Sequence, residues 1–270
     1  MINRRITRVL LNDTEITADV STPDSVQTTI DLTTADHIYL GFHGRFASRY
    51  IQIHTANNTA SVLSAQYWDG TTWSDVDDFI DQTASGGKTL SQSGFISWVN
   101  KTNWVVRSMT GIDSDVELFW IRLSVSQDLG ASTKLHSVLN IFSDDSILRA
   151  YFPELVTDTN YLPSGKTNFL QQHMAAKDLV TLRLKQRKMI QDESQIIDSN
   201  DVSVAAVYAA AMLILQPIAT SPASEALFKT AQMGFDQEIS KVSFAVDQDS
   251  DGIVDEEERT QSFSVGVFRR

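Results

Sequence analysis

The sequence predicts a two-domain α+β protein, with an N-terminal antiparallel β-sandwich of jelly-roll-like type and a small helical bundle that ends in a β-hairpin. From Ile2 to about Ser143, short β-rich runs alternate with Gly, Asn, Asp and Ser turns. Around Phe142 the apolar spacing changes from every second residue to about every 3.6 residues, the period of a helix. Residues 202–215 are apolar nearly all round, which predicts a buried helix. We therefore expect a β-sandwich domain at residues 1–143 and a helical domain at residues 144–270.

Composition narrows the possible functions. The chain has 270 residues, a formal net charge of −12 and a pI near 4.7, which argues against broad electrostatic binding to nucleic acid, although a local patch could still contact DNA. It contains no cysteine, which excludes disulfides and thiolate metal sites. The N-terminus carries Arg4, Arg5 and Arg8 but lacks the apolar region of a secretory signal, so we expect synthesis in the cytoplasm.

In the first domain, the β-rich runs predict strands at residues 38–42, 50–54, 62–68, 95–99, 104–107 and 118–125. Asp69-Gly70 marks a tight turn between two of them. In the last strand the alternation divides the side chains into two sets. The set expected to face the core is Phe119, Ile121, Leu123 and Val125; the opposite face carries Leu118, Trp120, Arg122 and Ser124.

The tryptophans leave two interpretations open. Large aromatic side chains commonly fill a sandwich core. Trp68, Trp73 and Trp98 could instead form an exposed strip that contacts a glycan or a protein partner, because flat rings stack on sugars. Exposure of all three rings on one face of the sandwich would favour the second interpretation, and burial would favour the first.

In the second domain, Asp144 or Asp145 is expected to cap a short helix at residues 146–151, which Pro153 interrupts. An apolar stripe that includes Phe169, His173 and Lys177 predicts a long helix at about residues 166–187. The end of this helix is basic, and its cations are Lys177, Arg183, Lys185, Arg187 and Lys188. They either form a solvated face near a helix C-terminus or contact an acidic partner or DNA.

The apolar run at residues 202–215 is the central helix of this domain, capped by Asp201 or Asn200 and stopped by Pro217. It is shorter than the roughly 20 apolar residues needed to span a bilayer, so we expect a core helix and no membrane partner. A third long helix opens at Ser221-Pro222, and Gly234 weakens it locally.

An acidic segment follows the third helix and fits the calcium-loop pattern position by position. Its expected ligands are Asp247, Asp249, Asp251, the carbonyl of Ile253, Asp255 and the bidentate Glu258. The flanks, residues 243–246 and 262–269, read as strands and not as the helices of a signalling EF-hand. The segment is either the Ca²⁺-binding tip of a β-hairpin or an acidic turn that only solvates the hairpin. No other cofactor is expected.

No catalytic constellation is evident in the sequence. The five histidines, His37, His43, His54, His136 and His173, show no metal spacing. The chain contains no GxSxG elbow, P-loop or GxGxxG. We therefore do not expect an enzyme.

Part of the first domain resembles a β-sandwich module that recurs in tailed-phage virion proteins. The similar phrases are YWDGTTWSDV (67–76), DQT (81–83), SGFISW (93–98), NW (103–104) and FWIRL (119–123). The resemblance implies an accessory surface of a virion and brings no catalytic residues.

Residues 144–270 resemble the head-to-tail adaptor, or connector, proteins of tailed phages in the order of their parts. These parts are a helix with Phe169, an Ala-rich core helix, a third helix, a DxDxDG segment and a final strand ending in Arg269-Arg270. The family implies a homo-oligomeric ring, commonly of about twelve copies, docked on the portal in the virion neck. The implied partners are the portal, the tail or neck proteins, neighbouring copies and the packaged DNA that passes through the lumen without sequence-specific binding. The large N-terminal sandwich departs from the minimal family pattern.

A second function remains open, a carbohydrate- or receptor-binding sandwich on the helical oligomerisation domain of a phage neck or tail protein.

Overall fold

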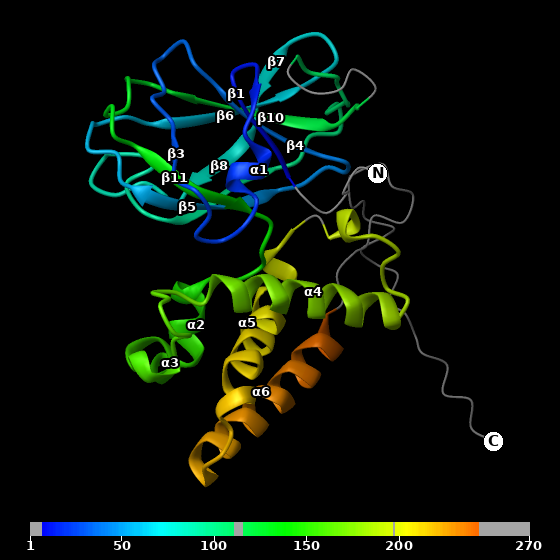
Figure 1. The fold of residues 1–270 in the computed structure, drawn as a ribbon. Coiled ribbons are helices and arrows are strands. Elements are labelled where there is room, and N and C mark those ends of the chain that lie inside the picture. The colour runs from blue at the N-terminus through cyan, green and yellow to red at the C-terminus, as the bar shows by residue number, and fades with distance from the viewer. Residues whose placement is uncertain (1–6, 111–115, 197, 243–270) are drawn as a thin grey trace, which may run out of the picture.

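The computed structural model describes residues 7–110, 116–196 and 198–242, and in them two antiparallel sheets precede a helical region (Figure 1). The six-stranded sheet has the order β2 (Thr14–Glu15), β1 (Arg8–Leu11), β4 (Ile38–Phe42), β10 (Phe119–Val125), β6 (Leu63–Trp68) and β7 (Trp73–Asp75). The five-stranded sheet has the order β3 (Thr28–Thr29), β11 (Lys134–Leu139), β5 (Ser48–Thr55), β9 (Gly94–Val99) and β8 (Asp77–Asp81). A short helix, α1 (Thr17–Val20), follows β2.

The two sheets share one apolar core. The predicted inward set of β10 is confirmed, because Ile121, Leu123 and Val125 are buried in this core and Phe119 packs against it. Leu118 and Trp120 lie on the opposite face as expected, where they are buried in a second cluster on the outer side of the six-stranded sheet. Trp120 lies opposite Gly41 of β4, and a Cβ on that glycine would lie 2.5 Å from the indole ring. The glycine therefore makes the space that the ring occupies.

The predicted strand at residues 104–107 is also wrong. This segment is a loop, and only Arg107 forms an isolated bridge to Leu118. Trp104 is nonetheless buried in the sandwich core, where its ring contacts Phe46 and Phe119. The β-forming residues of this segment therefore indicated the burial of Trp104 and not pairing with a neighbouring strand.

The helical region begins six residues after the last strand. Its elements are α2 (Asp145–Tyr151), α3 (Pro153–Thr157), η1 (Thr159–Tyr161), α4 (Leu170–Gln186), η2 (Glu193–Gln195), α5 (Asn200–Leu215), η3 (Gln216–Ile218) and α6 (Pro222–Lys241). The predicted domain boundary falls between Leu139, where β11 ends, and Asp145, where α2 begins. The predicted C-terminal hairpin lies outside the described residues.

Several helix ends follow local sequence signals. The Asp144 carboxylate caps α2, and Ser221 caps α6 with Pro222 in the first turn, as predicted. Pro153 does not simply interrupt a helix, because it opens α3. The expected caps of α5 are wrong by position. Asn200 and Asp201 belong to its first turn, and the Asp198 carboxylate accepts the Asn200 N–H at 2.8 Å.

The central helix α5 packs against both α4 and α6. Its alanines at positions 205, 206, 209, 210 and 211 are buried, so neighbouring helices approach closely. Gly234 of α6 faces the Tyr208 ring, and a Cβ there would collide with it, which explains a glycine inside a long helix. Among the described residues one stretch, Asn200–Ile218, is long and apolar enough to cross a membrane, and half of it is buried inside the protein. The core helix of a globular protein passes the same test.

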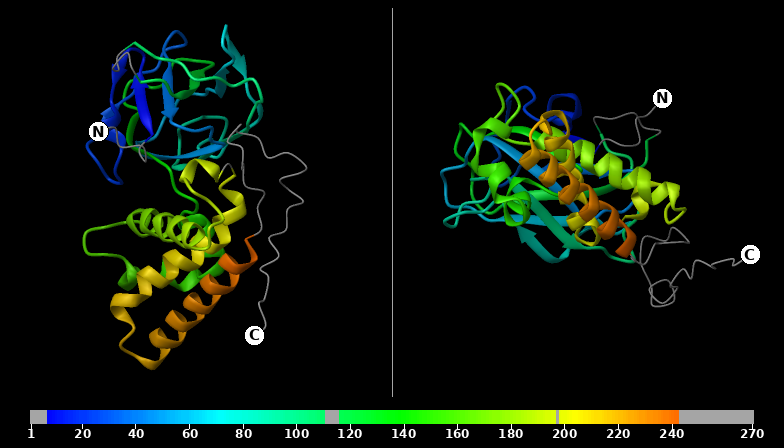
Figure 2. Two further views of the ribbon diagram at one scale, coloured as in Figure 1. Left: turned by 90° about the vertical axis from the view of Figure 1, so that its right-hand side faces the viewer. Right: turned by 90° about the horizontal axis from the view of Figure 1, so that it is seen from below.

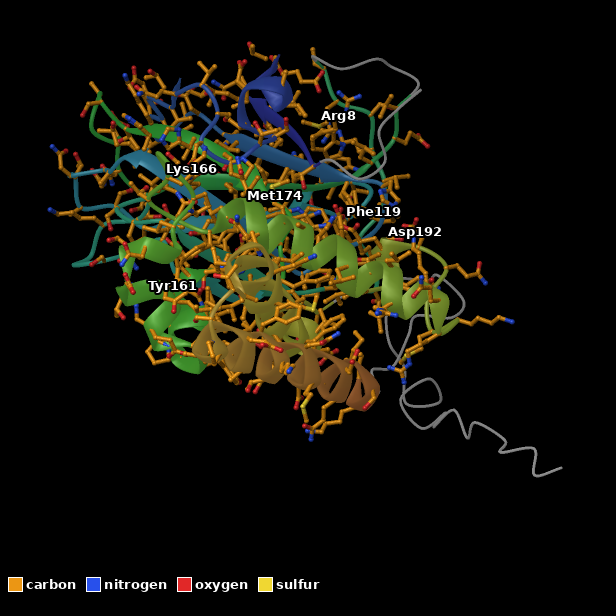
Figure 3. The ribbon with its side chains drawn as sticks, turned by 60° about the horizontal axis from the view of Figure 1, so that its bottom comes forward. Arg8, Phe119, Tyr161, Lys166, Met174 and Asp192 are labelled. Carbon is orange, nitrogen blue, oxygen red and sulfur yellow. The ribbon has the colours of Figure 1, made fainter. Side chains whose placement is uncertain are left out.

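The helical region lies against the five-stranded sheet, with α4 next to the sheet and α5 and α6 running away from it (Figure 2). Tyr50 of β5, Phe95 of β9 and Leu139 of β11 form a cluster with Leu170 and Met174 of α4. Lys166, Met174 and Asp192 lie along this boundary (Figure 3). Polar contacts cross it as well: Lys166 pairs with Asp24 at 2.9 Å, and His43 pairs with Asp192 at 2.8 Å.

Candidate functional site

The outer face of the six-stranded sheet carries two tryptophans that lie side by side. Trp68 of β6 is the register partner of Trp73 of β7, and their ring centroids are 5.6 Å apart in an edge-to-face arrangement. The Arg107 guanidinium lies 3.9 Å from the Trp68 ring centroid, and the Arg122 guanidinium lies 4.9 Å from that of Trp73. Both distances are within cation–π range. Each indole therefore has an arginine stacked on it.

Tyr39 of β4 completes this group, because its ring lies 5.5 Å from that of Trp73. Burial raises the pKa of the Tyr39 phenol, and the nearby Arg122 guanidinium opposes the shift. We call Tyr39, Trp68, Trp73, Arg107 and Arg122 the aromatic–arginine cluster; all five side chains are partly exposed. Within the described residues neither arginine forms an ion pair with a carboxylate.

The third predicted tryptophan lies elsewhere. Trp98 belongs to β9 of the other sheet, is 4% exposed and packs edge-to-face against Phe46 in the sandwich core, 5.3 Å between centroids. Trp68, Trp73 and Trp98 therefore do not form one strip. Trp98 fits the core-filling interpretation, whereas the Trp68–Trp73 pair keeps exposed ring surface.

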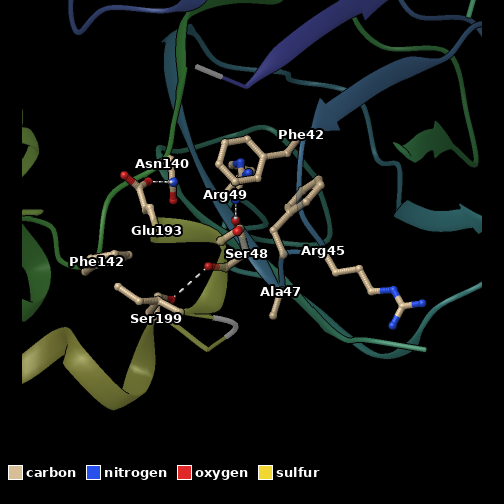
Figure 4. A pocket seen from close by; sticks show the side chains of 12 residues that line it. Phe42, Arg45, Ala47, Ser48, Arg49, Asn140, Phe142, Glu193 and Ser199 are labelled. Carbon is tan, nitrogen blue, oxygen red and sulfur yellow. Dashed lines mark hydrogen bonds between the residues drawn. The ribbon is translucent and has the colours of Figure 1, made fainter. Parts of the chain in front are cut away.

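A buried arginine at the boundary between sheet and helices was not predicted. Arg49 of β5 is 2% exposed, with Phe46 and Phe42 at 3.8 Å and 4.7 Å from its guanidinium (Figure 4). Its Nε donates to Thr7 Oγ1 and its Nη1 to the Ser48 carbonyl, each at 2.6 Å, while Nη2 has no hydrogen-bond partner within the described part of the chain. Burial lowers the Arg49 pKa to about 9, against the opposing effect of the Glu193 carboxylate.

The cavity beside Arg49 is too small for an organic cofactor. It offers about 10 Å³ to the centre of a water-sized molecule, roughly the space that one water needs. Asn140 and Glu193 close one side, with the Asn140 amide donating to the Glu193 carboxylate at 2.5 Å (Figure 4). Ser48 and Ser199 close another side, with their hydroxyls 2.9 Å apart. The arrangement joins the sheet to the helices and does not form a substrate pocket.

Lys177 is part of this boundary and not of an exposed basic face. Its ammonium lies 3.1 Å and 3.0 Å from the two Glu193 carboxylate oxygens, and both residues are buried. The expectation that Lys177 shares a solvated face with the later cations is therefore wrong. The sequence did contain a signal, since Lys177 falls on the apolar stripe of α4.

A serine, a histidine and an aspartate also meet at the start of the helical region. Ser143 Oγ lies 2.8 Å from His173 Nδ1, and His173 Nε2 lies 3.1 Å from the Asp145 carboxylate. These residue types form nucleophilic triads in hydrolases. Here Ser143 and His173 are fully buried, and Asp145 also accepts the Phe169 N–H at the start of α4. The group therefore links the strand end to α2 and α4, and no substrate can reach the serine in this conformation.

The larger hollow lies between β8 and β9 of the sheet and the first residues of α2 and α5, with a volume of about 410 Å³. Its wall contains both apolar and acidic side chains. Ile80 and Val99 are apolar and about half exposed, whereas Asp78 and Asp198 are acidic. Among the residues that the structure describes, no lysine, arginine or histidine lines it. The backbone of Asp78 is left-handed, at φ 48°, and the β8–β9 register shifts beside it, which blunts the sheet edge.

The basic end of α4 has two kinds of residue. The Arg187 guanidinium donates to the carbonyls of Ile239 and Ser240 at the end of α6, so this cation stabilises a helix C-terminus. Arg183 and Lys188 are exposed and Lys185 is partly exposed. The predicted partner contact at Arg183, Lys185 and Lys188 remains a prediction.

The predicted calcium ligands and the terminal arginines lie outside the described residues. These are Asp247, Asp249, Asp251, Ile253, Asp255, Glu258, Arg269 and Arg270. Within residues 7–110, 116–196 and 198–242, no group of three or more His, Asp or Glu side chains could hold a metal ion.

Comparison with known proteins finds no matching family model, no matching curated protein and no matching solved structure.

Proposed function

We propose that this chain is a structural protein of a tailed-phage virion, a head-to-tail adaptor subunit that docks on the portal and connects it to the tail. The observation that carries the proposal is the helical unit, in which the Ala-rich helix α5 is held between α4 and α6 directly after a complete two-sheet region. This order matches the resemblance of residues 144–270 to connector proteins.

In this proposal the mechanism is ring closure. Each copy presents two different surfaces to its neighbours, and repetition about one axis closes a ring of about twelve copies. The net charge of −12 would let an acidic lumen repel DNA phosphate, so that packaged DNA slides without sequence-specific binding. The sandwich, whose successive strands β4, β5 and β6 alternate between the sheets in a jelly-roll-like manner, would project as the contact surface.

The test is the composition of particles and the mass of the purified chain. Native mass spectrometry, alone and with the cognate portal, should give a ring of about a dozen copies. Purified virions should contain the chain in stoichiometric amounts in the neck. A chain that stays monomeric with portal and is missing from virions would contradict the proposal.

The acidic segment adds a separate experiment. If Asp247 to Glu258 hold Ca²⁺ at a hairpin tip, adding a chelator should lower the melting temperature, and restoring micromolar Ca²⁺ should reverse the change. An unchanged melting temperature would favour the solvated-turn interpretation.

A second function is supported by a specific observation, the partly exposed Trp68–Trp73 pair on the sheet face opposite the helices. In this alternative the sandwich is a carbohydrate- or receptor-binding module carried by a helical oligomerisation domain. A glycan array separates it from a purely structural role, because a structural subunit should bind no glycan.

A further inference from the structure

The two arginines of the aromatic–arginine cluster retain unused hydrogen-bond donors. A guanidinium carries five N–H donors. Arg122 directs Nε, at 3.0 Å, and Nη2 to the Gln66 side-chain oxygen, and a hydrogen bond between Arg122 and the Tyr39 phenol opposes the rise of the Tyr39 pKa. The Arg107 guanidinium lies over the Trp68 ring, and among the described residues it makes no side-chain hydrogen bond and no ion pair. Among the described residues, its remaining donors are therefore available to a ligand.

The position of these cations runs against the overall charge of the protein. The chain carries 34 acidic and 22 basic residues, yet within the described residues no carboxylate pairs with either arginine. The nearest acidic partner in the cross-strand row is Asp75, which accepts from Gln66 at 2.8 Å and so lies one residue removed from Arg122. A guanidinium left without a carboxylate partner beside aromatic rings is suited to bind an anion bidentately.

The shape of the surface indicates what kind of anion. Four members of the cluster lie on the adjacent strands β4, β10, β6 and β7, and Arg107 lies on the loop before β10, so the cluster is spread along one face of the sheet. Small-molecule sites are concave and bury most of the ligand. Exposed indole and phenol rings together with polar side chains suit an extended polymer with alternating flat and hydroxylated faces, as in a polysaccharide. Two cations are too few for nucleic acid, whose affinity depends on many phosphate contacts.

From this juxtaposition we infer that the aromatic–arginine cluster binds an acidic carbohydrate, a polysaccharide that carries carboxylate groups, and discriminates against its neutral counterpart. Arg107 and Arg122 pair with sugar carboxylates, while Trp73 and Tyr39 contact the sugar faces. The inference rests on the carbohydrate-binding alternative of the proposed function and specifies its ligand class; the adaptor proposal does not depend on it.

The experiment uses the full chain on an array of carboxylate-bearing polysaccharides, including polygalacturonate, alginate and polysialic acid, beside neutral glucans. Titration calorimetry then compares the best acidic binder with its methyl ester, which keeps the sugars and removes the charge. The inference expects binding to at least one acidic polysaccharide, a loss of about tenfold or more on esterification, since a hydrogen bond to a charged group contributes roughly 1.5–3 kcal/mol, and weaker binding at high salt.

Variants locate the site. Arg107→Gln and Arg122→Gln should each weaken binding by about tenfold, and Trp73→Ala should weaken it further, whereas Arg149→Gln, an exposed arginine on α2, is the matched control and should change nothing. Intrinsic tryptophan fluorescence confirms that each variant is folded, because all five tryptophans lie between residues 68 and 120.

Each outcome has a distinct meaning. Equal affinity for the acid and its ester overturns the acidic specificity and leaves carbohydrate binding standing. An affinity unchanged in both arginine variants overturns the location. No binding anywhere on the array overturns both the inference and the carbohydrate alternative. A change of oligomeric mass in the arginine variants without glycan binding assigns the cluster to contacts between copies and also overturns the inference.

Discussion

The outer faces of the two sheets differ in what lies on them. On the five-stranded sheet, Tyr50, Phe95 and Leu139 point outward and are covered by α4. On the six-stranded sheet, the outward side chains include Trp73 and Arg122, which remain partly exposed. Both faces come from the same two-residue alternation. The same alternation therefore has two outcomes: on one sheet the outward apolar side chains meet α4, and on the other the Trp73–Arg122 pair stays partly exposed.

The covered face is also held by polar groups that the open face lacks. The buried Lys177–Glu193 pair joins two parts of the helical region. Two further contacts join this region to the N-terminal region, the Lys166–Asp24 ion pair and the Ser48–Ser199 hydrogen bond. These contacts hold the helical region against the five-stranded sheet. Substitutions in the helical region can therefore disrupt this boundary without changing residues of the aromatic–arginine cluster.

The largest effect is expected from Ala210→Asp in the middle of α5. Ala210 is fully buried between helices, and an unpaired buried charge destabilises by about 5 kcal/mol or more. The helical region should unfold, which circular dichroism at 222 nm measures. Tryptophan fluorescence reports on the N-terminal region alone, since all five tryptophans lie between residues 68 and 120. Ser203→Asp, on a less buried side of the same helix, is the control and should keep full helicity. Native helicity in Ala210→Asp would disprove the assigned core.

Lys177→Met should come next. It leaves the Glu193 carboxylate buried without its cation, and breaking such a pair destabilises by about 3–5 kcal/mol. Urea unfolding measures the difference. The double variant Lys177→Met with Glu193→Leu removes both charges and should recover most of the loss, because two apolar groups can replace a buried pair. Failure of the double variant to recover would mean that Asn140, which also bonds Glu193, contributes more than the ion pair.

A matched pair of aromatic truncations compares the two faces directly. Phe95→Ala removes a ring from the covered face and should cost about 3–4 kcal/mol. Trp68→Ala removes a larger ring from the open face and should cost less, about 1–2 kcal/mol, because part of its surface is already in water. Chemical denaturation of both variants gives the order. A larger loss for Trp68 would show that the open face is structurally as important as the covered one.

Sequence periodicity identified most elements because period and local caps are short-range signals. The inward set of β10, the Asp144 cap of α2 and the Ser221 cap of α6 each depend on residues within about four positions of one another. These features were predicted correctly. The order of the sheets and the side that the helices cover were not, because they depend on contacts such as Phe95 with Leu170, which are far apart in the chain.

The candidate site was predicted in part for the same reason. Tryptophan composition pointed to Trp68 and Trp73 but could not separate them from Trp98, since the sheet to which a strand belongs is not a local property. The alternation of β10 placed Arg122 on this face, but neither arginine was selected as a site residue; for Arg107, stacking on Trp68 requires the loop before β10 to return over β6. Arg49 and Lys177 gave stronger signals, as each cation interrupts an otherwise apolar stripe or strand face.

The smallest expected effect concerns pH at the edge of the cover. Burial disfavours the Asp192 carboxylate, but hydrogen bonds from His43 and from Ser194 outweigh it and lower the Asp192 pKa to about 2. Because the folded pKa is depressed, the carboxylate stabilises the fold above pH about 4, its ordinary range, and this contribution is lost as pH falls toward 2.

Asp192→Asn should therefore be slightly less stable than the parent chain at pH 7, with a difference below about 1 kcal/mol because the group is half exposed. The difference should vanish by pH 2. Urea unfolding at pH 7, 4 and 2.5 measures it, and Asp236→Asn, an exposed carboxylate on α6, is the control. A gap that persists at low pH would mean that Asp192 acts through the capping geometry of η2 and not through its charge.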